Sequence, residues 1–458
     1  MFKRKCYKKL LEWKRISNGS TALLIEGARR VGKTTLAKTF AKAEYDSYLI
    51  VDFSKASTEV KRLFDECVDD ISTLLRMLQL YYSVELSERH SVVIFDEVQR
   101  YPRAREAIKH LVADGRFDYI ETGSLISIKK NVSDIVIPSE EDRVYLRPLD
   151  FEEYLWALGR SMLASEIRNC CEKLVPLPDV LHRQAMRLFD EYLVVGGMPQ
   201  AVQAFVDDET FTKCEREKRR ILDLYKDDIL KFGNEESSKA LAMFEGIPGQ
   251  LSMASKRFRY GSLGKNARKE HYQGAVKWLE DSHIVNVCRQ CNDPNVGFKL
   301  TSDDSAIKIY MGDTGLLVSH AFADNNDSLK VQRALQFGKI SVNKGMLVEN
   351  YVAQQLVSSG HSLFFHTWEE VPESEDAKRS RQREVDFLIT KGFSDAAGKP
   401  RVTPIEVKSS KNYASTVSLD DFAIKYAQRL GKEIVLHPKQ LSVVGNREYL
   451  PLYMAFCI

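Results

Sequence analysis

The sequence predicts a multidomain protein of mixed α/β class, and three observations lead to that prediction. The chain has 458 residues, and domains of about 150 residues would divide it into roughly three. Short apolar runs alternate with helical periodicity near both ends, a pattern typical of parallel sheets covered by helices. A glycine-rich loop at residues 27–34 lies between one apolar run and the helix that follows it.

Composition and charge exclude several classes of protein. Hydrophobic residues make up 44% and charged residues 29%, which is enough apolar material to bury cores and is unlike a disordered chain. The formal net charge is only +3, so nucleic-acid binding would have to come from local basic patches. No apolar run approaches the ~18 residues of a membrane span, and the 8 cysteines without framework spacing suit a reducing compartment. We expect a cytoplasmic protein without a membrane partner.

Residues 1–18 are expected to form an N-terminal helix. The segment is basic, and Tyr7, Leu10, Leu11 and Trp13 fall on one helical face. It lacks the apolar core of a signal peptide. We expect this face to pack on the next domain, with a membrane-surface helix as the alternative.

Residues 19–150 are expected to form an α/β nucleotide-binding domain. Residues 21–26 are a short apolar strand and residues 34–42 a helix. Three further apolar runs, at 48–53, 91–95 and 119–122, are of the buried-strand type found in parallel sheets.

The loop between the first strand and its helix reads GARRVGKT at residues 27–34 and fits GxxxxGK[ST] without deviation. Its glycines let consecutive backbone amides surround a phosphate, and the helix N-terminus adds a favourable dipole. Lys33 is expected to reach the β- and γ-phosphates, and the Thr34 hydroxyl to ligate Mg²⁺. The expected nucleotide-binding residues are Gly27, Arg30, Val31, Gly32, Lys33, Thr34, Thr35 and Ser124.

The run VVIFDE at residues 92–97 supplies the second half of the site. Asp96 is expected to complete the Mg²⁺ shell with Thr34, and Glu97 to orient and deprotonate the attacking water. A third strand ends in small polar residues at 121–124, of which Ser124 is placed to sense the γ-phosphate. The sequence therefore predicts ATP and Mg²⁺ as cofactors and Lys33, Asp96 and Glu97 as catalytic residues.

Arg143 and Arg147 follow this third strand. Either is a candidate arginine finger that would act across a subunit interface, and Arg143 is the one we select. The alternative is a solvated surface arginine for each.

The middle of the chain changes character. Residues 151–235 are helical and charged, with a helix-joining turn expected at the GGMP sequence of residues 196–199. Residues 236–325 contain several helices, including one at 269–281, and then two expected strands at 284–288 and 298–301. Helices followed by a small hairpin predict a winged helix-turn-helix.

A local basic patch precedes the last helix of that segment. Residues 256–269 contain six basic residues and no acidic one, with two aromatic residues among them. We expect contact with duplex DNA here, against the alternative of a solvated or protein-binding face. The basic residues are Lys256, Arg257, Arg259, Lys265, Arg268 and Lys269.

Residues 335–458 are again α/β and contain four polar residues in a telling order. Residues 345–357 form an expected helix with Glu349 beside its apolar stripe. Asp386 lies on an expected strand at 384–390, and Glu406 and Lys408 share one face of another at 404–408.

Two resemblances connect these observations. Residues 27–35, 95–99, 122–124 and 147–154 resemble one bacterial and archaeal family of AAA-type ATPases of the AAA+ class, and residues 192–199 and 278–285 match its later signatures. The resemblance spans nearly the whole chain. It implies ATP binding and hydrolysis, a helical lid at 151–235, a winged helix at 236–325, and a C-terminal domain of unknown function with a nuclease-like fold at 335–458.

The C-terminal residues resemble the E…D…ExK layout of PD-(D/E)XK nucleases, with Val385 in place of the proline. That resemblance implies Mg²⁺ or Mn²⁺ held by Glu349, Asp386 and Glu406, with Lys408 polarising the attacking water. An active nuclease and a decayed domain that only binds a partner both remain open.

Three functions are compatible with this sequence. The first is an ATP-hydrolysing, DNA-associated protein in which nucleotide state repositions the winged helix and the nuclease-like tail. The second is a switch in which ATP controls homo-oligomerisation or a protein partner and the tail has no chemistry. The third is a DNA-binding regulator that makes no use of the tail carboxylates.

Overall fold

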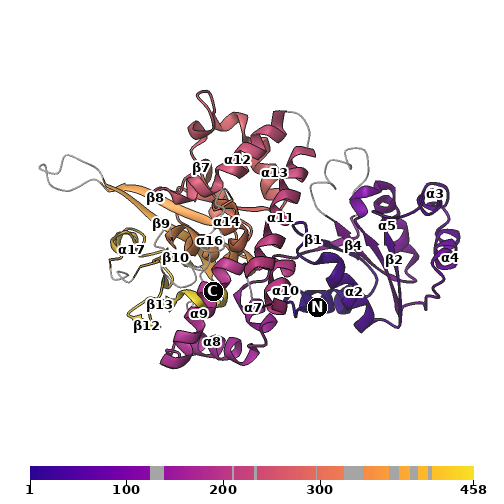
Figure 1. Cartoon of the computed structure of the whole chain (residues 1–458), viewed down its shortest axis with the longest axis horizontal. Coiled ribbons are helices and arrows are strands. Elements are labelled where there is room, and N and C mark those ends of the chain that lie inside the picture. The colour runs from indigo at the N-terminus through magenta and orange to yellow at the C-terminus, as the bar shows by residue number, and fades with distance from the viewer. Residues whose placement is uncertain are drawn as a thin grey trace, which may run out of the picture. The chain divides into compact units, whose positions relative to one another are not determined.

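The computed structural model describes residues 1–123, 139–208, 211–231, 235–295, 297–323, 344–370, 381–391, 401–410 and 415–458. The chain divides into two compact units (Figure 1). The first consists of Met1–Arg147 and Asp281–His283, and the second of Pro148–Glu280 and Ile284–Ile458. Within the described ranges, no helix combines the length and apolarity that a bilayer span requires.

The first unit is built on a five-stranded sheet in the order β2-β3-β4-β1-β5, in which each strand runs parallel to its neighbours. The central strands are buried on both faces, as a parallel sheet covered by helices requires. The α/β prediction for this region is confirmed. The strands are β1 (Ala22–Glu26), β2 (Ser47–Asp52), β3 (Ser91–Asp96), β4 (Asp118–Gly123) and β5 (Glu141–Tyr145).

Helices cover both faces of this sheet. The helices α3 (Thr58–Glu66), α4 (Ile71–Tyr82) and α5 (Pro102–Asp114) share one hydrophobic core with alternate residues of β1 and β3. The buried side chains of α2 (Lys33–Glu44) lie outside that core although α2 packs on four of the strands. Alternation along a strand sends neighbouring side chains to opposite faces, which explains the two layers.

The N-terminal helix α1 (Cys6–Ser17) packs on α2 and β5, as the sequence predicts. The Tyr7 and Phe40 rings meet edge to face with their centroids 5.4 Å apart. The Trp13 indole donates to the Thr21 hydroxyl at 3.2 Å. Leu10 and Trp13 of the expected apolar face are therefore buried against the protein itself, whereas Leu11 is exposed because it lies off the contact.

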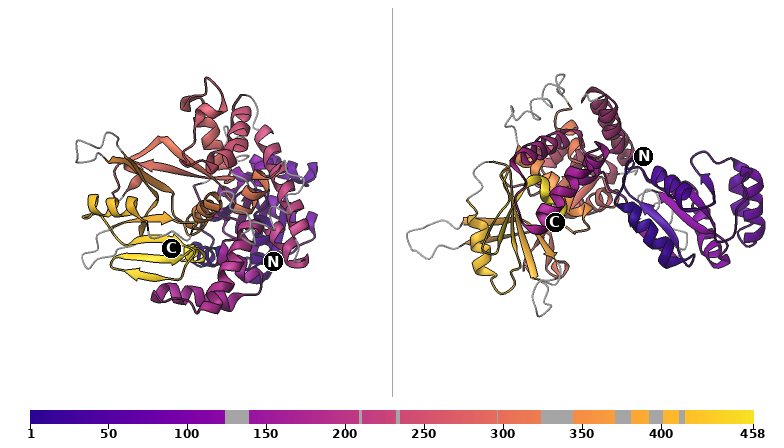
Figure 2. Two further views of the ribbon diagram at one scale, coloured as in Figure 1. Left: turned by 60° about the vertical axis from the view of Figure 1, so that its left-hand side comes forward. Right: turned by 90° about the horizontal axis from the view of Figure 1, so that it is seen from below.

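The second unit combines a helical region with a mixed eight-stranded sheet in the order β12-β13-β11-β10-β9-β8-β6-β7. In both views of Figure 2 the strands β8 to β13 form a layer with α17 on one side and the main group of helices on the other. The strands are β6 (Val285–Cys291), β7 (Ser302–Met311), β8 (Phe364–Glu370), β9 (Arg381–Lys391), β10 (Arg401–Val407), β11 (Glu433–His437), β12 (Ser442–Val444) and β13 (Arg447–Pro451).

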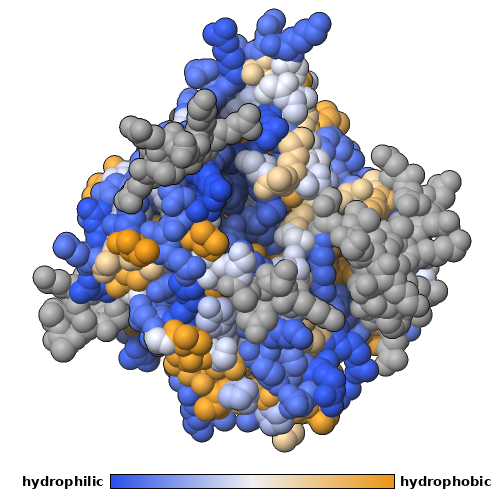
Figure 3. Space-filling view, turned by 90° about the vertical axis from the view of Figure 1, so that its left-hand side faces the viewer, coloured by the Kyte–Doolittle hydropathy of each residue, from blue (hydrophilic) through white to orange (hydrophobic). Residues whose placement is uncertain are grey.

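The described residues of 151–231 form five helices separated by short segments, a helical region as the sequence predicts. The face of the second unit seen in Figure 3 is mainly hydrophilic, and its hydrophobic side chains lie in small separate groups. The helices of this unit are α7 (Phe151–Ala157), α8 (Ser161–Lys173), α9 (Asp179–Val195), α10 (Pro199–Asp208), α11 (Phe211–Lys231), α12 (Glu235–Ser252), α13 (Gln273–Asp281), α14 (Thr314–Ala321), α16 (Lys344–Ser358) and α17 (Val417–Lys425).

The hairpin of β6 and β7 belongs to the same sheet as the C-terminal strands. β6 pairs antiparallel with β7 and parallel with β8, through Arg289↔Phe364 and Gln290↔Phe365. The β6–β7 hairpin, in the segment where the wing of a winged helix was expected, is therefore hydrogen-bonded through β8 to the strands of the expected nuclease-like domain.

The strand predicted at 298–301 is wrong. Phe298–Leu300 is a 3₁₀ helix that begins after Gly297, whose φ is 87°. The strand that pairs with β6 starts only at Ser302. Four residues with two apolar side chains, Phe298 and Leu300, are too few to show a periodicity that distinguishes a strand from a helical turn.

The turn at residues 196–199 joins α9 and α10, as predicted, and packs closely against two other segments. Gly197 N donates to the Asp313 carboxylate at 2.6 Å, and a Cβ at Gly197 would lie 2.0 Å from the Leu149 carbonyl oxygen. Asp313 also accepts from Leu316 N at 2.9 Å and so caps α14. Only glycine fits at position 197.

We predict that Gly197→Ala destabilises the protein by ~1–3 kcal/mol, because the methyl group forces backbone atoms apart. Thermal unfolding of the full chain measures the loss. The matched control is Gly249→Ala within α12, where nothing lies within 4 Å of the new Cβ and alanine favours the helix. Equal midpoints for the two variants would contradict the prediction.

Candidate functional site

The motif residues of the first unit gather at one edge of its sheet. β4 lies between β1 and β3, and all three run parallel. The glycine-rich loop follows β1, Asp96 ends β3, and Thr122 lies near the end of β4. Because the carboxyl ends of parallel strands share one edge, the topology brings these three segments together.

The loop holds Lys33 in an enclosed position. Lys33 is 6% exposed, and its ammonium donates to the carbonyl oxygens of Gly27 and Ala28 at 2.9 and 3.0 Å. Burial lowers the pKa of Lys33 to about 8, although the carboxylates of Glu97 and Asp96 oppose that shift. A Cβ at Gly27 would lie 2.2 Å from the Leu146 carbonyl oxygen, so the loop closes only with glycine there.

Two hydroxyl groups bind one oxygen of the Asp96 carboxylate. Thr34 Oγ1 donates to Asp96 Oδ1 at 2.7 Å, and the Thr122 hydroxyl donates to the same atom. The Thr34 hydroxyl at the start of α2 and the Asp96 carboxylate at the end of β3 are hard oxygen ligands of the kind that Mg²⁺ binds together with phosphate oxygens. These residues therefore fit a magnesium–nucleotide complex.

Glu97 follows the strand in a constrained conformation. Its φ is 56°, in the left-handed region that few non-glycine residues adopt. Its backbone N–H donates to Thr122 Oγ1 at 3.4 Å, and Gln99 Nε2 donates to its carboxylate at 2.6 Å. Such local strain is characteristic of functional positions, and here it orients a carboxylate beside Asp96.

The remaining predicted nucleotide-site residues are in varied surroundings. Arg30 and Thr35 are exposed and Val31 is buried. Gly32, with φ 98°, precedes the first residue of α2. Ser124 lies outside the described residues.

Arg4 is a contact that the sequence analysis missed. This buried side chain donates to the Val31 carbonyl in the glycine-rich loop at 3.1 Å and to the Arg147 carbonyl at 2.5 Å. The N-terminal segment thereby supports the loop from outside. A single arginine ahead of the first helix carries no motif that would have indicated this role.

Arg143 lies on β5 and is bound within its own unit. Its guanidinium is 2.9 Å from Glu141 and 3.8 Å from Glu26, and its side chain is 37% exposed. Arg147 contacts His283 Nδ1 at 3.1 Å. A role for Arg143 as an arginine finger stays a prediction.

The side chains of three glutamates are enclosed beside the strands of this sheet. Glu26, Glu121 and Glu141 come from β1, β4 and β5, and Arg105 of α5 contacts Glu141 at 2.6 Å. Burial, reinforced by the Glu141 charge, raises the pKa of Glu121 well above its ordinary value. Burial also raises the pKa of Glu26, the residue before the glycine-rich loop.

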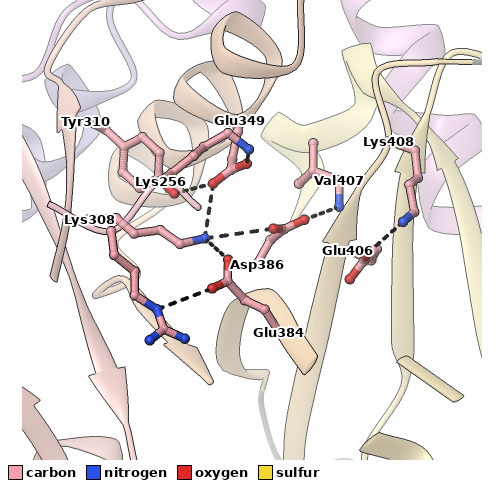
Figure 4. A network of polar contacts seen from close by, with 10 residues as sticks. Lys256, Lys308, Tyr310, Glu349, Glu384, Asp386, Glu406, Val407 and Lys408 are labelled. Atoms are coloured by element: carbon pink, nitrogen blue, oxygen red, sulfur yellow. Dashed lines mark hydrogen bonds and ion pairs between the residues drawn. The ribbon is translucent and has the colours of Figure 1, made fainter. Parts of the chain in front are cut away.

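In the second unit, three of the four predicted tail residues lie near one another in a buried cluster (Figure 4). Glu349 is on α16, Asp386 on β9 and Glu406 on β10. Lys408 Nζ binds the Glu406 carboxylate at 2.7 Å. Burial, together with the charges of Glu349 and Glu406, raises the pKa of Asp386 to about 8.

A lysine that the sequence analysis did not select lies among these carboxylates. Lys308 Nζ of β7 is 3.2 Å from Glu349, 2.8 Å from Glu384 and 3.8 Å from Asp386 (Figure 4). Within the described ranges, no three His, Cys, Asp or Glu side chains are grouped so that they could hold a metal ion. The residues present therefore do not fit the Mg²⁺ or Mn²⁺ that the nuclease resemblance implies.

The basic patch divides into two parts. Lys256 is ion-paired with Glu349, and Arg257 Nε lies 3.7 Å from Glu384. Both half-buried side chains therefore face carboxylates of the protein, and the expectation that they meet DNA phosphates does not fit these contacts. Arg259, Lys265 and Arg268 are exposed, and Lys269 is half-buried.

Comparison with known proteins agrees with the geometry of the first unit. Residues 19–155 match the model of an AAA domain. The chain contains an AAA-type P-loop domain. Residues 186–327 match a domain of unknown function (DUF8612), and residues 344–454 match another (DUF4143). No curated protein matches the chain.

Solved structures show only distant likeness. A Walker-type ATPase of Pyrococcus abyssi is 14% identical, with 70% of this chain and 96% of that chain covered and a TM-score of 0.42. The RuvB Holliday junction branch migration motor of Thermotoga maritima is 12% identical, with 64% of this chain and 90% of that chain covered and a TM-score of 0.27. Drosophila ORC bound to DNA is 13% identical, with 70% of this chain and 96% of that chain covered and a TM-score of 0.27. No conclusion about function rests on scores this low.

The buried glutamates predict a pH dependence of stability. A carboxyl group whose folded-state pKa is raised contributes stability that is present below its unfolded pKa and is lost as pH rises through the folded value. Glu121→Gln removes this loss because the amide stays neutral. We predict that the thermal midpoint of Glu121→Gln minus that of wild type increases by several degrees from pH 5 to pH 8.

The exposed Glu88 supplies the control for this experiment. Glu88→Gln should leave the midpoint difference from wild type constant across the same pH range. A Glu121→Gln difference that is independent of pH would show that Glu121 is not held protonated by burial.

Proposed function

We propose that the first unit binds ATP with Mg²⁺ and hydrolyses it. The observation that carries the proposal is that the hydroxyls of Thr34 and Thr122 both donate to Asp96 Oδ1. The buried Lys33 ammonium is held in the glycine-rich loop of the same site. Thr34 and Asp96 would hold the metal, which when bound neutralises charge on the phosphate oxygens.

The remaining residues have distinct roles in this reaction. Lys33 exchanges the carbonyls of its own loop for the β- and γ-phosphate oxygens. The Glu97 carboxylate accepts a proton from water as the water oxygen attacks the γ-phosphorus and the bond to the bridging oxygen of ADP breaks. The Gln99 contact at 2.6 Å holds that carboxylate in place.

We predict that Glu97→Gln lowers ATP turnover by ~10²–10⁴-fold while leaving nucleotide affinity close to that of wild type, since only proton transfer is removed. Lys33→Ala should lose both turnover and affinity. Phosphate release and binding of a fluorescent ATP analogue measure the two quantities. Glu88→Gln is the matched control, and turnover by Glu97→Gln equal to that of wild type would refute the assignment.

A second proposal concerns DNA. Arg259, Lys265 and Arg268 are exposed on a segment without acidic residues between 256 and 269, which favours contact with a phosphate backbone. In this proposal ATP turnover in the first unit is coupled to duplex binding by the second. The alternative is a switch in which ATP controls oligomerisation or a protein partner.

We predict that the triple variant Arg259→Glu, Lys265→Glu and Arg268→Glu weakens duplex binding at least ~10-fold at low salt, since phosphate contacts dominate affinity there. Stimulation of ATP turnover by duplex DNA should fall with it. The control reverses three exposed basic residues elsewhere, Lys173, Arg183 and Arg187.

Unchanged duplex affinity in the triple variant would exclude this surface. Turnover indifferent to DNA, with an assembly size that changes on adding ATP to Glu97→Gln, would favour the switch. The lid, winged-helix and nuclease-like divisions of the chain stay predictions throughout.

A further inference from the structure

The buried cluster of the second unit contains its own cation. Lys308 is 0% exposed, and its ammonium lies within 4 Å of Glu349, Glu384 and Asp386. Three carboxyl groups around one buried ammonium give the pairing that a buried cation requires.

The carboxylates around it are committed to partners on the protein. Glu349 accepts from Lys308, from Lys256 and from the Tyr310 hydroxyl, the last at 2.6 Å. Asp386 Oδ2 accepts from the backbone N–H of Val407 at 2.8 Å. These contacts leave Glu349 and Asp386 joined through the lysine.

One oxygen in the cluster region has no partner. Glu406 is 8% exposed, and its Oε2 forms no hydrogen bond with any residue that the structure describes, while Oε1 accepts from Lys408 at 2.7 Å. An unsatisfied buried carboxylate oxygen is costly. It is the one remaining indication of a cation site here, and Lys308 lies on the other side of Asp386 from it (Figure 4).

A divalent metal and this ammonium compete for the same space. Mg²⁺ requires oxygen ligands at ~2.0–2.1 Å in near-octahedral geometry. The Lys308 Nζ atom stands between Glu349 and Asp386, which would both have to bind that metal. Repulsion between two cations in a buried site adds to the steric conflict.

The structure assigns to Lys308 the role of resident cation among the carboxyl groups of Glu349, Glu384 and Asp386. The second unit then binds neither Mg²⁺ nor Mn²⁺ at Glu349, Asp386 and Glu406. The cluster instead links β7 to α16 and β9 through buried ion pairs. This inference does not depend on the proposed ATPase.

The test is Mn²⁺ binding by the full chain without nucleotide, measured by the electron paramagnetic resonance of free Mn²⁺. Mn²⁺ binding that is lost in the Asp386→Asn variant is assigned to the cluster. Any Mn²⁺ bound by the first unit is present in both proteins and cancels in this comparison. Lys308→Met should acquire such a site, at least ~10-fold tighter than wild type, because unpaired buried carboxylates remain. Mn²⁺ should also raise the thermal midpoint of Lys308→Met but not of wild type.

The control is Lys299→Met, at an exposed lysine outside the cluster. Asp386-dependent Mn²⁺ binding by wild type would overturn the inference, as would a folded Lys308→Met that gains none. If Lys308→Met does not fold, Lys308→Gln provides the same test. Even without a folded Lys308 variant, the comparison of Mn²⁺ binding by wild type and by Asp386→Asn tests the inference. None of these measurements depends on ATP turnover.

Discussion

The cost of burying charge is the constraint on which both units depend. A buried ion loses the solvation of water, and in a folded protein it must be paired, hydrogen-bonded or neutralised. Lys33, Glu121 and Lys308 are each enclosed, and each meets this requirement in a different way. Lys33 uses carbonyls of its own loop, Glu121 retains a proton, and Lys308 is surrounded by carboxylates.

These three solutions have different consequences for function. The carbonyl partners of Lys33 are weak and local, so phosphate oxygens can replace them when a nucleotide binds. The partners of Lys308 are carboxyl groups on α16 and β9, so exchange for another cation would disrupt several buried ion pairs together. The first arrangement is suited to ligand exchange and the second to a permanent contact.

Much of the first unit was predictable because its signals are local. The glycine-rich loop runs directly into the helix that begins at Lys33, and Asp96 is the last residue of its apolar strand, so each signal lies in one short segment. The error at Phe298–Leu300 has the same physical origin, since four residues are too few to show a period. The support of the loop by Arg4 was unpredictable because the partner atoms are backbone carbonyls, which leave no trace in sequence.

By itself the sequence determined where the glycine-rich loop and the Asp96–Glu97 pair lie and predicted a nucleotide site from them, because both motifs are short contiguous segments. It also determined which helix carries Glu349 and which strands carry Asp386 and Glu406. Only the tertiary structure decided what lies among those carboxylates. Lys308 is 41 residues from Glu349 in sequence and reaches it only after β7 joins the sheet of the C-terminal strands. Side-chain contacts between distant strands depend on register and sheet order, and no local pattern specifies either.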